Sequence, residues 1–264
     1  MKVAADNLRS VSICGLPISV IDMDAAIEKI CSWVATHQSK YVCVRDVHGL
    51  MISAENPEMM RIHHAAGMVT PDGMPIVWAA QRRSRLKINR VCGTDLVDVL
   101  CNKGQSKGLR HYFYGGKPGI PEKMIGKLRS KYPDLCVAGY YSPPFHCLDT
   151  EEDAEVVRCI NESGANIVWV GLCTPKQELW MRDHVNLIKG ATLIGVGAAF
   201  DFHAGIVKRA PEWMQNSGLE WLHRLASEPR RLWRRYLIIA PLFVIKYVRE
   251  EISANPARRR QLPR

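Results

Sequence analysis

The chain has 264 residues, of which 47% are hydrophobic and 23% are charged, and its formal net charge is +10. This length and ordinary globular composition favour one α/β domain with an appendage over two equal domains. The nine cysteines include no C-x-x-C pair, so they indicate reduced core residues of a cytoplasmic protein and exclude a disulfide framework or zinc site.

The basic charge is concentrated near the C-terminal end. Residues 220–264 contain eleven Lys and Arg but only four Asp and Glu, and so carry +7 of the total. Such a segment favours phosphates or an anionic membrane surface as a partner. The N-terminal residues show no signal-peptide pattern, and the longest apolar run, 236–247, is too short to span a bilayer. We therefore expect a soluble or peripheral protein.

In the first third of the chain, short β-like runs alternate with helical patterns. Residues 12–20 predict a strand or hairpin, and the β-branched run 40–47 predicts a buried strand. Helical spacing predicts helices from about residue 22 to 33, over 50–65 with an interruption at 56–57, and over 76–82. Asp22 and Asp24 form a D-x-D pair, which a metal-dependent sugar-nucleotide enzyme could use, but its place directly before a helical run favours an N-cap.

Polar residues follow two of the predicted strands. Asp46 and His48 come at the end of the 40–47 run, where His48 fits a ligand contact or a core histidine equally well. Asp72 precedes Gly73 at the end of the next short strand. A carboxylate at the C-terminal end of a strand and ahead of a helix lies where α/β sheets bind their ligands, so it is a candidate catalytic residue. The alternative is that Asp72 only shapes the turn.

The second half continues the alternation of strand, loop and helix. Strands are predicted over 110–116, 135–141, 166–171 and 191–199, and helices over 121–131, 150–163 and 179–185. A further helix is predicted after Arg90, capped by Thr94 or Asp95, and the 179–185 helix is predicted to be capped by Thr174, with Lys176, Gln177 and Glu178 pointing into the site. The repeated units predict a Rossmann-like, mostly parallel sheet with helices on both faces. They also divide the chain into an α/β domain, 1–219, and a basic amphipathic helical appendage, 220–264.

The appendage contains a predicted helix from Glu228-Pro229. Arginines spaced four apart form a cationic flank, and an apolar stripe runs alongside it. The flank comprises Arg230, Arg231, Arg234 and Arg235, and the stripe comprises Leu232, Tyr236, Ile239 and Phe243. Such a helix fits the interface of an anionic membrane. The alternative is a helix packed on its own domain with a solvated basic face.

Several loops, taken together, resemble those of the WecG/TagA/CpsF family of bacterial glycosyltransferases. The similarity covers roughly residues 12–245, and the last block is the most specific. The matching stretches are PDGMPIVWAA (71–80), RVCGTDL (90–96), YFYGGKPG (112–119), GLCTPKQELW (171–180) and residues 195–237. Many members carry T-x-N where this chain has Val44-Arg45-Asp46.

The resemblance implies inverting transfer of a sugar from a UDP-sugar to a polyprenyl-diphosphate-linked acceptor. The transfer takes place at the inner face of the cytoplasmic membrane, with a peripherally bound enzyme and no cofactor or required metal. By position, Asp72 resembles the general base, and Arg90 and Gln177 resemble residues near the leaving diphosphate and sugar. Substrate contacts are expected at Asp46, His48, Thr94, Gly115, Gly116, Tyr140, Gly171, Lys176, Gly197 and Asp201. Membrane and acceptor contacts are expected at Arg224, Arg230, Arg231, Arg234 and Arg235.

The residues also support inverting transfer when the family resemblance is set aside. An inverting transfer needs a carboxylate to accept the acceptor hydroxyl's proton, and the departing diphosphate needs cations. One rival is a basic α/β protein that binds nucleic acid or membrane without transferase activity. We expect no nucleic-acid partner, because the tail shows no helix-turn-helix or RNA-binding signature. A second rival, a Rossmann oxidoreductase, lacks the dinucleotide fingerprint. The donor sugar, the acceptor glycan and homo-oligomerisation stay open.

Overall fold

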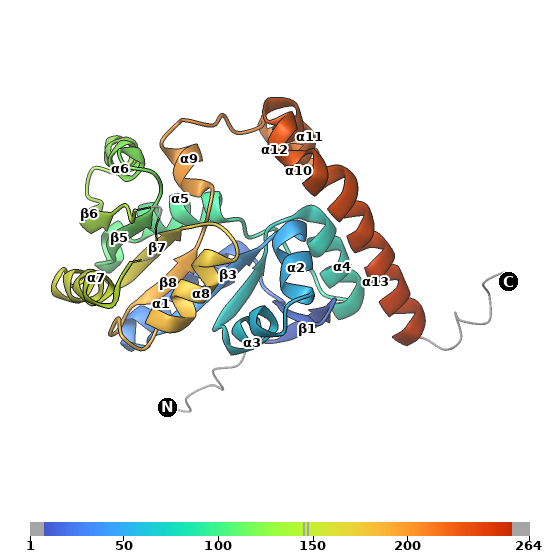
Figure 1. Ribbon diagram of the computed structural model, residues 1–264, viewed down its shortest axis with the longest axis horizontal. Helices are drawn as coiled ribbons and strands as arrows, with labels where there is room; N and C mark the ends of the chain where they lie inside the picture. Colours follow the sequence, from blue (N-terminus) through green and yellow to red (C-terminus); the bar gives the residue numbers. More distant parts are fainter. Residues whose placement is uncertain (1–7, 145, 147, 255–264) are drawn as a thin grey trace, which may run out of the picture.

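The fold is built on one parallel sheet in the computed structural model, which describes residues 8–144, 146 and 148–254 (Figure 1). The strand order is β4-β3-β8-β7-β5-β6, and every neighbouring pair is parallel. The strands are β3 (Lys40–Arg45), β4 (Met68–Pro71), β5 (Arg110–Gly115), β6 (Cys136–Tyr141), β7 (Ile167–Gly171) and β8 (Thr192–Gly195). A separate antiparallel hairpin pairs β1 (Ser10–Ile13) with β2 (Leu16–Ser19). The predicted Rossmann-like sheet is confirmed.

Helices cover both faces of the sheet, because alternate strand residues point into two cores. Tyr41 and Cys43 belong to one core, and Val42 and Val44 belong to the other. The first core is covered by α2 (Val47–Ala54), α3 (Pro57–Ala65), α4 (Met74–Ser84), α7 (Thr150–Glu162) and α8 (Lys176–His184). The second is covered by α1 (Met23–Ala35), α5 (Gly93–Lys103), α6 (Ile120–Lys131) and α9 (Ala199–His203).

Two predicted helix caps are wrong, whereas the predicted cap at Asp22 is confirmed by its 3.0 Å hydrogen bond from the Ala25 amide. Helix α5 begins earlier than predicted, after Cys92, so Thr94 and Asp95 lie inside its first turn. Pro175 occupies the N-cap position of α8. The Thr174 hydroxyl donates instead to the Glu178 carboxylate at 3.2 Å.

The C-terminal helices pack along the outer side of the domain (Figure 1). They are α10 (Glu212–Asn216), α11 (Glu220–Ser227), α12 (Pro229–Arg234), the π-helix η2 (Arg235–Ile239) and α13 (Ala240–Ala254). Phe243 of α13 is 3% exposed within the first core. On α4, Arg83 donates to Glu251 at 2.7 Å. We call residues 220–254 the tail; the proposed domain boundary at 220 stays a prediction.

The predicted apolar stripe of the tail faces the domain. Leu232 and Phe243 are buried, and Ile239 packs against the first core. The expectation that this stripe meets a membrane is therefore wrong. A different set of apolar side chains faces outward: Trp233, Leu237, Ile238, Leu242, Val244, Ile245 and Val248. None of the helices in the described ranges is both long and apolar enough to cross a bilayer.

Candidate active site

A cavity of about 540 Å³ opens at the C-terminal ends of β3, β4, β7 and β8. The chain leaves β3 for α2 on one face of the sheet and leaves β8 for α9 on the other. Loops that diverge in this way open a crevice between neighbouring parallel strands, which is where α/β proteins bind ligands. Of the residues predicted for the site, Asp46, His48, Asp72, Arg90, Thr94, Gln177, Gly197, Arg224 and Arg235 line the cavity.

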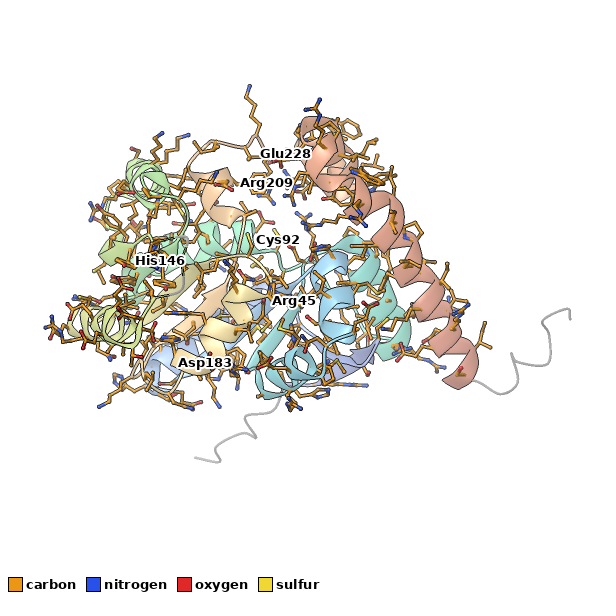
Figure 2. The ribbon with its side chains drawn as sticks, viewed as in Figure 1. Arg45, Cys92, His146, Asp183, Arg209 and Glu228 are labelled. Atoms are coloured by element: carbon orange, nitrogen blue, oxygen red, sulfur yellow. The ribbon has the colours of Figure 1, made fainter. Side chains whose placement is uncertain are left out.

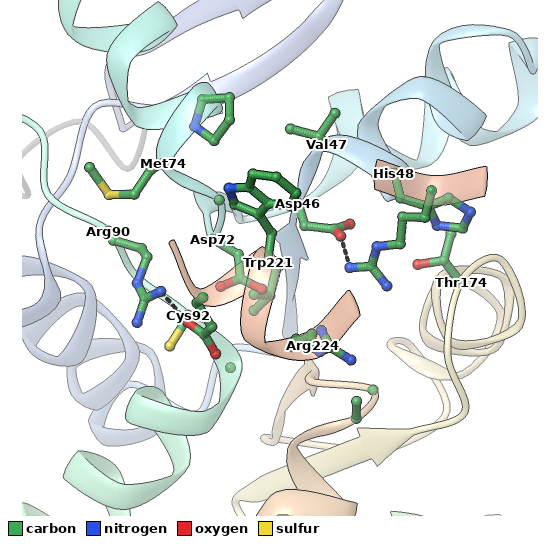
Figure 3. Close-up of a pocket in the computed structure, with 18 of the residues that line it drawn as sticks. Asp46, Val47, His48, Asp72, Met74, Arg90, Cys92, Thr174, Trp221 and Arg224 are labelled. Atoms are coloured by element: carbon green, nitrogen blue, oxygen red, sulfur yellow. Dashed lines mark hydrogen bonds and ion pairs between the residues drawn. The ribbon is translucent and has the colours of Figure 1, made fainter. Parts of the chain in front are cut away.

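Asp72 lies directly after β4 and lines the cavity (Figure 3). Its backbone amide donates to the Arg45 carbonyl at 2.8 Å, which holds this residue beside the end of β3. The pKa of Asp72 is raised to about 6, mainly by burial and then by the nearby charge of Asp46, while Arg90 opposes the shift. A carboxylate with a pKa near 6 is ionised at neutral pH and still basic enough to accept a proton during catalysis.

Arg90 lies near Asp72 in the loop before α5 (Figure 3). It donates to Glu220 of the tail at 2.6 Å, and its other terminal nitrogen lies 3.6 Å from Asp95. Burial alone would lower the pKa of Arg90, but the negative groups around it, including Asp72, raise the pKa above its usual value. Arg90 therefore supplies a permanent positive charge beside the candidate base.

Asp46 and Arg235 form an ion pair across the cavity that joins α2 to the tail (Figure 3). Asp46 also caps α2 by accepting the Gly49 amide at 2.8 Å. Burial would raise the pKa of Asp46, but Arg235 and the Gly49 amide outweigh burial and lower it to about 2. His48 has a lowered pKa because of burial and the nearby charge of Arg235, so it is neutral at pH 7.

The tail contributes two of its predicted arginines to the cavity wall. These are Arg224, whose guanidinium lies 5.4 Å from the centroid of the Phe202 ring, and Arg235. The exposed Arg230, Arg231 and Arg234 lie outside the lining. The tail therefore presents cations both into the cavity and to the surrounding solvent.

Six predicted substrate contacts lie outside the cavity lining: Gly115, Gly116, Tyr140, Gly171, Lys176 and Asp201. The three glycines lie where neighbouring backbone or ring atoms come so close that a side chain would not fit without a shift. A Cβ on Gly115 would stand 2.7 Å from the Gly171 backbone, and a Cβ on Gly171 would stand 2.7 Å from the Phe200 ring. Tyr140 is 47% exposed on the edge strand β6. The proposed roles of all six in binding stay predictions.

Beneath the cavity, Arg45 and Glu178 form a fully buried ion pair between β3 and α8. Figure 2 labels Arg45 among the central elements of the fold. Of the three α8 residues predicted to point into the site, only Gln177 lines the cavity. Lys176 is exposed, and Glu178 is buried against Arg45 because a buried guanidinium requires an opposite charge.

Several cavity residues were missed by the sequence reasoning, among them Cys92, Phe202, Glu220, Trp221 and Tyr236. The Cys92 thiol donates to Asp95 at 3.0 Å, and burial followed by the charges of Asp72 and Asp95 raises its pKa. Glu220 opens the tail, and no local pattern marks it as the partner of a residue 130 positions earlier. Within the described ranges, no group of three or more His, Cys, Asp or Glu residues is arranged to hold a metal ion.

The fold and cavity place the protein among α/β proteins whose ligands bind at the C-terminal ends of parallel strands. The model of the glycosyl transferase WecG/TagA/CpsF family matches residues 11–257. The chain therefore belongs to this family, as its motifs predicted. Membership indicates glycosyltransferase activity in the synthesis of cell-surface polysaccharide, and so a sugar donor and an acceptor.

Proposed function

We propose that this protein is an inverting, metal-independent glycosyltransferase that uses a UDP-sugar. It transfers a hexose or N-acetylhexosamine, with N-acetylmannosamine and its uronic acid among the candidates, to a polyprenyl-diphosphate-linked sugar. The observation that carries the proposal is the juxtaposition of Asp72, whose pKa is about 6, with the cation Arg90 in one cavity. The family membership supplies the class of reaction.

In the proposed reaction, Asp72 removes the proton from the attacking hydroxyl of the acceptor. The new bond forms between that oxygen and the anomeric carbon of the donor, while the bond from this carbon to the UDP oxygen breaks on the opposite face. The configuration at the anomeric carbon is therefore inverted. Arg90, Arg224 and Arg235 are available to balance the charge that develops on the diphosphate.

We further propose that the outward face of the tail docks on an anionic membrane and delivers the lipid-linked acceptor to the cavity. Leu237 is 57% exposed and Val244 is 53% exposed, and Arg230, Arg231 and Arg234 lie nearby along the same helical segment. Apolar side chains next to arginines suit the interface of a bilayer, where each arginine near an anionic leaflet contributes roughly 1 kcal/mol. This surface replaces the stripe predicted from the sequence.

The test is a screen of UDP-sugars for UDP release in the presence of a polyprenyl-diphosphate-linked sugar. We expect release with one donor class and only in the presence of acceptor, and inversion is read from the anomeric configuration of the product. No release with any donor would contradict the proposal. Binding to DNA that exceeds binding to anionic liposomes at every salt concentration would favour the nucleic-acid-binding alternative.

A further inference from the structure

The side-chain amide of Gln177 is held in one orientation by its neighbour Glu178. The Gln177 nitrogen, Nε2, lies 2.8 Å from Glu178 Oε1. A carboxylate can only accept hydrogen bonds, so the group of the amide that faces it must be the NH₂ donor. The carbonyl oxygen of Gln177 must then point the other way.

Glu178 is itself fixed by contacts that the rest of the fold provides. Its Oε1 accepts from Arg45 and from the Thr174 hydroxyl as well as from Gln177. Arg45 in turn donates to Thr174 at 3.1 Å. Gly49 of α2 leaves the space that this guanidinium occupies, because a Cβ there would stand 2.6 Å from Arg45 Nη1. The buried pair therefore forms a rigid support under Gln177.

The carbonyl oxygen of the Gln177 side chain, Oε1, is the end of the amide that faces away from Glu178, and Gln177 lines the cavity. Gln177 is 3% exposed, and its Oε1 is buried with no hydrogen-bond partner among the described residues. This oxygen lies 3.5 Å from the position of a Cβ on Gly197, and Cys173 lies beside the same position. Gly197 and Cys173 both line the cavity. A buried acceptor without a partner is costly, and a ligand that donates a hydrogen bond removes that cost.

Resting on the transferase activity proposed above, we propose that Arg45 and Glu178 are positioning residues that orient Gln177. In this orientation, Gln177 Oε1 accepts a hydrogen bond from a hydroxyl or an amide N–H of the bound sugar. Gln177 in this role selects a hydrogen-bond donor on the sugar and does not donate to the diphosphate. A sugar that lacks the matching donor leaves the buried oxygen unpaired and is discriminated against.

Donor analogues test whether the oxygen of Gln177 accepts from the sugar. UDP-sugars in which one hydroxyl or the acetamido group is replaced by hydrogen are compared in the wild type and in Q177M, which keeps the length of the side chain but lacks its oxygen. We expect one such analogue to lower kcat/KM for UDP release at least tenfold in the wild type, and to be used within about threefold of the parent sugar in Q177M. A merely structural role lowers kcat/KM for both sugars alike and leaves their ratio unchanged. A wild type that uses every analogue as well as the parent sugar, or an unchanged ratio in Q177M, would overturn the proposal.

A second measurement tests the positioning without any transferase activity. The Gln177 side-chain NH₂ signals, identified in a ¹⁵N spectrum by their absence in Q177E, should exchange slowly with water in the wild type. In R45M/E178M, which removes both buried charges together and so leaves neither unpaired, and also removes the acceptor of the Gln177 NH₂, exchange should accelerate at least tenfold at unchanged Tm. Unchanged exchange would overturn the positioning role. If the wild type transfers no sugar, the proposed function fails, and this exchange measurement still decides whether Glu178 orients Gln177.

Discussion

The substitution Asp72→Asn should change activity and stability in opposite directions. Asparagine keeps the shape of the side chain but cannot accept the proton of the attacking hydroxyl. We therefore expect turnover to fall by on the order of a hundredfold or more, with UDP binding retained. The same substitution removes a charge whose ionisation is disfavoured by burial and by the neighbouring Asp46.

The size of the stability gain follows from the pKa shift. The pKa of Asp72 rises from its ordinary 3.8 to about 6 in the folded protein. At about 1.4 kcal/mol per pKa unit, ionised Asp72 lowers the free energy of unfolding by roughly 3 kcal/mol above pH 6. This penalty is absent well below pH 3.8, grows as the pH rises, and is complete once the pH has passed the folded-state value. Relief of the full penalty corresponds to an increase in Tm of roughly 5–10 °C.

The assay compares Tm for wild type and Asp72→Asn at pH 5 and pH 8, together with single-turnover UDP release. The gain should be about twice as large at pH 8 as at pH 5, because Asp72 is mostly protonated in the folded state at pH 5. Asp24→Asn is the matched control, since the Asp24 side chain is 79% exposed. A Tm gain that is equal at both pH values, or turnover close to wild type, would refute the reasoning.

Three further predictions concern pH, metal and membrane. The acid limb of kcat/KM, which reports the free enzyme, should follow the ionisation of Asp72 near pH 6. Asp46→Asn should move this limb to lower pH, because the charge of Asp46 raises the pKa of Asp72, and a limb that stays in place would contradict the electrostatic account. Treatment with EDTA should leave UDP release unchanged, whereas a loss restored by Mg²⁺ or Mn²⁺ would show that a metal participates. The double variant Leu237→Asp with Ile245→Asp should no longer sediment with anionic liposomes. The control variant Leu187→Asp, which changes a 50% exposed leucine on the loop before β8, should sediment like the wild type. Equal sedimentation of the wild type, the double variant and the control would exclude the outward face of the tail as the membrane contact.

The parts of the site that follow strand ends were predictable from local sequence. The run of β-branched residues before Asp46 predicted a buried strand, and the D-G step at Asp72 predicted a carboxylate at the end of the next one. Both residues line the cavity because the strands are parallel neighbours, with Arg45 beside Pro71 in register. A parallel sheet brings its strand ends together whatever the loops contain, so placement at a strand end is a strong indication of the site.

The buried ion pair was not predictable in this way. Arg45 and Glu178 are 133 positions apart, and arginine and glutamate are residue types that are usually exposed. Nothing in the sequence near Arg45 indicates that its charge is balanced from α8. Local pattern therefore identified Gln177 as a candidate but not the support that orients it.

The orientation of the tail was missed for a different reason. The tail helices have apolar side chains on two sides, so their periodicity does not reveal which side is buried.

The two ion pairs of the cavity couple the proposed chemistry to the position of the tail. Arg90 is paired with Glu220 and Asp46 with Arg235, so one partner in each pair belongs to the tail. A diphosphate that binds Arg90 or Arg235 competes with the carboxylate already there and weakens a contact that holds the tail against the domain. By thermodynamic linkage, a membrane that favours one position of the tail must change the affinity for the donor by the same factor. Donor affinity measured with and without anionic liposomes should therefore differ in the wild type and be equal in Leu237→Asp with Ile245→Asp.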